Sequence, residues 1–123
     1  MLNPTSTTLN GGLDYAIPET GRKYRFSDFV LCTKQNVLMQ GDQMIMLNSK
    51  ALQCLTLLVI NANSVVLRES FFNHVWRNCF VGDGVLSVNI SCLRKLLGKN
   101  KIKTYSGKGY IFREPVQIIE DDD

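Results

Sequence analysis

The segment from Val85 to Gly98 constrains the fold more than any other part of the chain. Apolar residues recur in it at spacings of four, three and four, namely Leu86, Ile90, Leu93 and Leu97. At about 100° per residue, an α-helix brings such positions within roughly 60° of one another. Gly98 follows directly, and glycine commonly ends helices. The spacing therefore predicts a helix over 85–97 that turns one apolar stripe toward a core.

The opposite side of this helix carries small, polar and basic side chains. It presents Val88, Ser91, Cys92, Lys95 and Lys99, with Ser87 and Arg94 on one flank. The major groove of DNA, about 12 Å wide, admits such a helix. The small side chains would allow close approach to base edges, and the basic ones would reach phosphates. Val88 has two interpretations, a contact to thymine methyl groups or an isolated apolar surface residue.

A basic hairpin is expected after the helix. Strand-like residues 103–105 and 110–112 flank Ser106-Gly107-Lys108-Gly109, a pattern typical of a hairpin with a glycine-rich tip. Its candidate DNA-binding residues are Lys103, Thr104 and Lys108. The net charge is +3, but residues 84–113 hold seven Lys or Arg and no acid, whereas residues 114–123 hold five acids and no base. A basic block favours a nucleic-acid partner, with a solvated surface face as the alternative.

Strands and two further helices are expected before this region. Residues 24–31 suggest one strand with an irregularity near Ser27-Asp28, and strands at 37–39 and 44–46 would complete an antiparallel meander. A helix from about 49 to 61 would be capped by Asn48 or Ser49. An extended link at Val65-Val66 leads to a helix over 68–76, where Leu67 stands in place of a capping residue. A loop is expected over 78–84.

Four cysteines and one histidine argue against a metal site or an enzyme. They form no C-x-x-C pair, and no cofactor fingerprint is present, so we expect no catalysis, cofactor or metal. Cys54 lies in an apolar stretch and is typical of a core residue. Cys79 and Cys92 would be redox-sensitive if exposed, although a lone cysteine is more often inert. His74 is more typical of a surface or half-buried residue than of a catalytic base.

The matching pieces from Tyr24 to Pro115 resemble the OmpR/PhoB-type winged-helix effector domain of bacterial regulators, and within it the CadC/ToxR-like branch. They cover about three quarters of the chain and are specific in their order and spacing. The pieces are YRFSDFVL at 24–31, LNSK at 47–50, VVLRE at 65–69, VW at 75–76, VGDG at 81–84, VNISCLRKLLG at 88–98 and GKGYIF at 107–112.

The resemblance implies an α+β winged helix-turn-helix with an N-terminal four-stranded antiparallel sheet, three helices and a C-terminal hairpin. It implies that 85–97 is the recognition helix and 106–110 the wing tip. Trp76 matches a tryptophan that lies against the DNA backbone in this family, with a core anchor as the alternative. The family's RNA polymerase contact loop would comprise Asn78, Cys79, Phe80, Val81, Gly82, Asp83 and Gly84.

The chain departs from the response-regulator branch in its charges. Ser91 and Cys92 stand where that branch often carries arginines, and Ser106 stands before the wing glycine where arginine is common. Within this chain no receiver domain precedes the effector, so control by aspartyl phosphorylation is not expected here. In the ToxR-like branch a following helix often tethers the domain to the inner membrane. Such a tether would require the protein to continue beyond residue 123.

The sequence thus predicts a disordered arm over 1–22, a winged-helix domain over 23–115 and an acidic tail over 116–123. The leading hypothesis is a transcriptional regulator, and specifically an activator, that binds promoter DNA, with self-association on tandem sites as a further option. The alternative is a winged-helix protein-interaction module with a degenerate DNA face. No signal-peptide pattern opens the chain, and the apolar runs are far below the ~20 residues of a membrane span. We expect a reducing bacterial cytoplasm, or the cytoplasmic part of an inner-membrane regulator.

Overall fold

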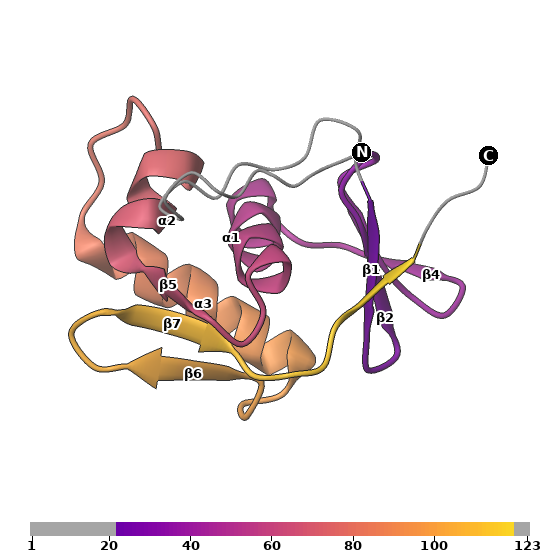
Figure 1. The fold of residues 1–123 in the computed structure, drawn as a ribbon. Helices are drawn as coiled ribbons and strands as arrows, with labels where there is room; N and C mark the ends of the chain where they lie inside the picture. The colour runs from indigo at the N-terminus through magenta and orange to yellow at the C-terminus, as the bar shows by residue number, and fades with distance from the viewer. Residues whose placement is uncertain (1–21, 120–123) are drawn as a thin grey trace, which may run out of the picture.

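A five-stranded antiparallel sheet holds both ends of residues 22–119, the part of the chain that the computed structural model describes (Figure 1). Its strand order is β4-β3-β2-β1-β8. The strands are β1 (Lys23–Phe26), β2 (Phe29–Cys32), β3 (Val37–Gln40), β4 (Gln43–Ile45) and β8 (Gln117–Ile119). The predicted meander is therefore present, and it gains a strand from the C-terminal end of the domain.

Two sequence predictions about this sheet were wrong. The irregularity at Ser27-Asp28 is a two-residue hairpin turn, because Phe26 pairs with Phe29 and Ser27 has a φ of 53°. Residues 117–119, which the sequence assigned to the acidic tail, form β8 and pair with β1. The sheet thus has five strands where the resemblance implied four. The predicted arm lies outside the described residues except for Arg22, and the last four residues of the tail lie outside them as well.

Three helices pack beside this sheet: α1 (Ser49–Ile60), α2 (Arg68–Val75) and α3 (Asp83–Leu97). Asn48 caps α1, because its side chain accepts a hydrogen bond of 2.9 Å from the backbone N–H of Ala51. The start of α2 has no side-chain cap, as expected from Leu67. Its end is stabilised from α1 instead, since Lys50 Nζ donates to the Val75 carbonyl at 2.9 Å.

The core lies where α1 meets the two other helices and both sheets (Figure 1). The predicted stripe of α3 is buried, with Leu86 and Leu93 fully inaccessible to solvent. Aromatic rings join the layers. Phe26 of β1 meets the ring of Phe112 edge-on at 5.1 Å between centroids, and Phe71 of α2 meets Tyr110 in the same way at 6.0 Å.

The second sheet is the wing. Its order is β5-β7-β6, formed by β5 (Val65–Leu67), β6 (Ile102–Tyr105) and β7 (Gly109–Phe112). The predicted hairpin is confirmed, and Val65-Val66, expected as a plain link, belongs to a strand that pairs with β7. At Gly109 the backbones of β5 and β7 come so close that a Cβ would overlap the Val66 carbonyl oxygen and lie 2.9 Å from Leu67 Cα.

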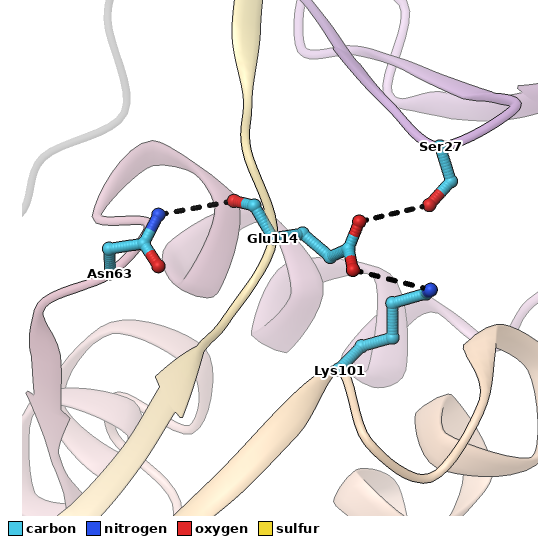
Figure 2. Close-up of polar contacts among 4 residues, drawn as sticks. All are labelled: Ser27, Asn63, Lys101 and Glu114. Carbon is cyan, nitrogen blue, oxygen red and sulfur yellow. Dashed lines mark hydrogen bonds and ion pairs between the residues drawn. The ribbon is translucent and has the colours of Figure 1, made fainter.

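Glu114 connects the wing to the rest of the fold just after β7 (Figure 2). Its carboxylate accepts from Ser27 Oγ at 3.2 Å and pairs with Lys101 Nζ at 3.3 Å. Its backbone carbonyl accepts from Asn63 Nδ2 at 3.1 Å. The β1–β2 turn, the α1–β5 turn and the link between α3 and β6 therefore meet at one residue, and the chain continues from it into β8.

Gly109→Ala is expected to destabilise the fold by about 1–3 kcal/mol, because the added methyl group must push β5 and β7 apart. The matched control is Gly84→Ala in α3, where a Cβ would meet nothing within 4 Å and alanine favours the helix. Urea unfolding of both variants against the parent measures the difference. Equal stability of the Gly109→Ala variant and the parent would show that the two strands are not held this closely.

Candidate nucleic-acid interface

The side of α3 opposite the core is open to solvent. Val88 is 67% exposed, and Ser87, Ser91 and Lys95 are also exposed, while Cys92 is half-buried. The sequence predicted this orientation, and the burial of the opposite stripe confirms it. The outer face has small side chains along its middle and a lysine toward its C-terminal end. Such a face can approach a groove closely without a steric barrier.

The wing runs alongside α3, and β6 begins near the C-terminal end of the helix (Figure 1). Its tip is the three-residue turn of Ser106 to Lys108, shorter than the expected 106–110, and Gly107 adopts a φ of 74° there. Lys103, Thr104 and Lys108 are exposed on the hairpin. Lys99 is exposed as well, in the turn after Gly98, whose φ of 112° ends α3. The predicted outer face of α3 and the predicted wing residues thus belong to neighbouring surfaces.

Two members of the basic block are engaged within the molecule. Lys101 pairs with Glu114. Arg94 donates to the Ile102 carbonyl from Nε at 3.0 Å and from Nη2 at 2.7 Å, and Nη2 also reaches Thr104 Oγ1 at 3.0 Å. The sequence assigned Arg94 to phosphates and did not anticipate these bonds, because a backbone acceptor leaves no trace in a side-chain pattern. The exposed cations of the block are Lys95, Lys99, Lys103, Lys108 and Arg113.

Trp76 lies inside the fold, at the C-terminal end of α2. It is 5% exposed, and its ring packs on that of Phe72 at 5.7 Å between centroids. Of its two interpretations, the core anchor is the one that its burial supports. A contact to the DNA backbone stays a prediction.

The α2–α3 connection is shorter than the sequence suggested. Asp83 and Gly84, expected in the loop, form the start of α3. The remaining loop turns at Asn78, whose φ is 63°, and exposes Cys79, Val81 and Gly82. The side chain of Phe80 is completely exposed. Aromatic side chains are usually buried, and those left exposed are enriched at protein interfaces. The exposed ring therefore makes this loop a candidate protein contact.

The cysteines of the described residues lie in different surroundings. Burial raises the pKa of the Cys54 thiol to about 12, against a smaller opposing effect of the Lys50 ammonium, so this thiol stays protonated in the core. Cys79 is exposed and Cys92 half-buried. Among residues 22–119, no group of three or more His, Cys, Asp or Glu side chains could hold a metal ion. None of the helices among these residues has the length and apolar character of a membrane span.

Comparison with known proteins identifies similar sequences in bacteria. The family described as "Transcriptional regulatory protein, C terminal" matches residues 42–112. The chain is 32% identical over 101 residues to the response regulator protein GraR of Staphylococcus aureus, a match that covers 78% of this chain and 45% of GraR. The chain thus spans less than half of that curated relative.

Solved structures match the fold along most of its length. The DNA-binding domain of Escherichia coli CadC superposes with a TM-score of 0.69 at 22% identity, covering 80% of this chain and 97% of that domain. The DNA-binding domain of Klebsiella pneumoniae RstA, solved in complex with the RstA box, gives a TM-score of 0.64 at 25% identity. That match covers 74% of this chain and 96% of the RstA domain.

Proposed function

The chain belongs to the family of OmpR/PhoB-type winged-helix domains, the C-terminal domains of transcriptional regulatory proteins. From this premise we propose that it reads promoter DNA with α3 in the major groove and the wing on the adjacent backbone. The chain is a DNA-binding regulator domain of the response-regulator type, and its relatives are bacterial. We place its work in the bacterial cytoplasm, where promoter DNA is found.

The observation that carries this proposal is that two exposed surfaces, the outer face of α3 and the wing, lie next to each other. The outer face of α3 has no bulky side chain along its middle, and the exposed cations lie at its C-terminal end and on the wing. Phosphate contacts supply affinity, whereas base edges are reached by the small central residues. The RstA domain, a similar fold, was solved in complex with the RstA box, which supports a DNA-binding role for this chain.

Activation through RNA polymerase is the second part of the proposal. The completely exposed ring of Phe80 projects from the loop that joins α2 to α3, outside the helix itself. Aromatic side chains are preferred anchors of protein interfaces. We assign this loop to a polymerase contact, and we expect copies of the chain to associate on tandem sites.

DNA binding is tested on sites selected from a random duplex library, and the arrangement of the selected half-sites reports on tandem association. With such a site, Lys95→Ala, Lys99→Ala and Lys108→Ala should each weaken binding and make the log–log salt slope shallower by about one unit. Lys34→Ala is the control, because Lys34 lies in the β2–β3 turn. This turn is at the opposite end of β2 from the β1–β2 turn, which contacts Glu114 beside the wing. Unchanged slopes for all three variants would refute the assignment, and a parent that does not bind DNA would favour the protein-interaction module.

Phe80→Ala should reduce promoter activation by up to about 30-fold while leaving DNA affinity unchanged, since an interface anchor worth about 2 kcal/mol corresponds to that factor. Met46→Ala is the control, because Met46 is also a highly exposed apolar side chain and lies on another part of the chain, just before α1. In vitro transcription and DNA titration on the same promoter separate the two effects. Joint loss of activation and affinity would argue against a separate polymerase contact.

Val88→Ala should change the free energy of unfolding by less than about 0.5 kcal/mol, because the side chain is mostly exposed. On the selected site it should cost about 1 kcal/mol of binding, less than a bidentate base contact, if Val88 meets a thymine methyl group. The measurement is a two-by-two cycle of parent or Val88→Ala protein against thymine or uracil DNA. On uracil DNA, Val88→Ala should no longer weaken binding, and in the Val88→Ala variant the change from thymine to uracil should have no effect. Additive effects would exclude the contact.

A further inference from the structure

Arg94 is the one side chain of α3 that hydrogen-bonds to the wing, as far as the described residues go. Its Nε and Nη2 both donate to the Ile102 carbonyl of β6, and Nη2 also donates to Thr104 Oγ1. Its Cζ lies 5.9 Å from the centroid of the Tyr110 ring of β7. A single guanidinium therefore touches both strands of the hairpin.

The position of the Ile102 carbonyl explains why it needs such a partner. The neighbouring pair is hydrogen-bonded, because the backbone N–H of Arg113 donates to the Lys101 carbonyl at 2.7 Å. In an antiparallel ladder the next residue, Ile102, then points its carbonyl away from β7. Since β6 is the edge strand of the wing, no further strand lies there to donate to it. Arg94 of α3 supplies the donor that a neighbouring strand would otherwise provide.

On the side of β6, the outer part of the wing has no other contact of this kind among the described residues. Residues 103–108 are all exposed, so no buried side chain packs the hairpin tip against the domain. On the other side, the backbone N–H of Arg68 donates to the Lys108 carbonyl at 3.0 Å. The direction in which Lys108 projects relative to α3 thus depends on the pairing of β7 with β5 on one side and on the guanidinium of Arg94 on the side of β6.

We propose that Arg94 is a positioning residue that sets the wing relative to the outer face of α3, so that Lys108 and the recognition helix reach one duplex together. This inference rests on the proposed function. It assigns to Arg94 an effect on affinity that acts through the wing. The role requires arginine, because its planar fork offers two parallel donors to one acceptor, whereas lysine offers a point charge on a flexible stem.

The test is Arg94→Lys, which keeps the charge and removes the fork. DNA affinity should fall about tenfold, and the salt slope should become shallower by about one unit although no charge is lost, because Lys108 no longer reaches its phosphate. Lys108→Ala should then have no further effect in the Arg94→Lys background. Lys95→Ala, the control on the same helix, should keep its full effect in both backgrounds. Parent-like affinity of Arg94→Lys, or full additivity with Lys108→Ala, would overturn the proposal.

A second measurement needs no DNA. Backbone ¹⁵N relaxation should show larger fast motions for residues 103–108 in Arg94→Lys than in the parent, with α3 unchanged. Thr104→Val removes one acceptor of the guanidinium and should loosen the same residues to a smaller degree, which covers the case of an unfolded Arg94→Lys variant. Wing order equal to that of the parent in these variants would overturn the proposal. A parent that fails to bind DNA while these motions appear would instead reject the proposed function alone.

Discussion

Burial of the apolar stripe of α3 is the constraint on which the rest of the arrangement depends. Leu86, Ile90, Leu93 and Leu97 are all withdrawn from water. Burying a side chain of this kind contributes about 1.5–3 kcal/mol before entropy is counted, so the four residues together form a large part of the driving force for docking α3. Rotating the helix by one residue would turn these side chains away from the core. The core therefore decides which face of α3 points outward, before any ligand is present.

The position of the wing relative to the outer face of α3 is fixed by contacts on three sides. On one side, the missing side chain of Gly109 lets the backbone of β5 approach β7 closely. On the other, Arg94 joins β6 to α3. Just after β7, Glu114 joins the wing to the β1–β2 turn and to the link that precedes β6 (Figure 2). The N-terminal sheet, α3 and the wing consequently behave as one frame and not as separate modules.

Much of this frame was predictable, because helices and hairpins leave periodic or glycine-based signals in the sequence. The stripe of α3 and its exposed opposite face followed from spacing alone. The turn at Ser27-Asp28 escaped prediction, since it contains neither the glycine nor the asparagine that usually marks a two-residue hairpin. Strand β8 escaped because three residues carry no usable period, and its existence depends on pairing with β1, far away in sequence. The bonds of Arg94 escaped because their main acceptor is a backbone carbonyl, which every residue possesses.

The distribution of charge has a consequence for specificity under the proposed function. Of the seven basic residues between 84 and 113, five remain exposed after Arg94 and Lys101 are committed inside the molecule. Five phosphate contacts would give a salt slope near −4.5 and a loss of roughly 500-fold in affinity between 50 and 200 mM salt. None of these cations lies at the middle of the α3 face, where Ser91 and Cys92 replace the long side chains that could form bidentate contacts worth about 1–3 kcal/mol each. Under the proposed function, a single copy of such a domain would bind DNA readily but would discriminate only modestly between DNA sequences. Two copies on adjacent half-sites multiply their discrimination, which is the physical reason to expect tandem association.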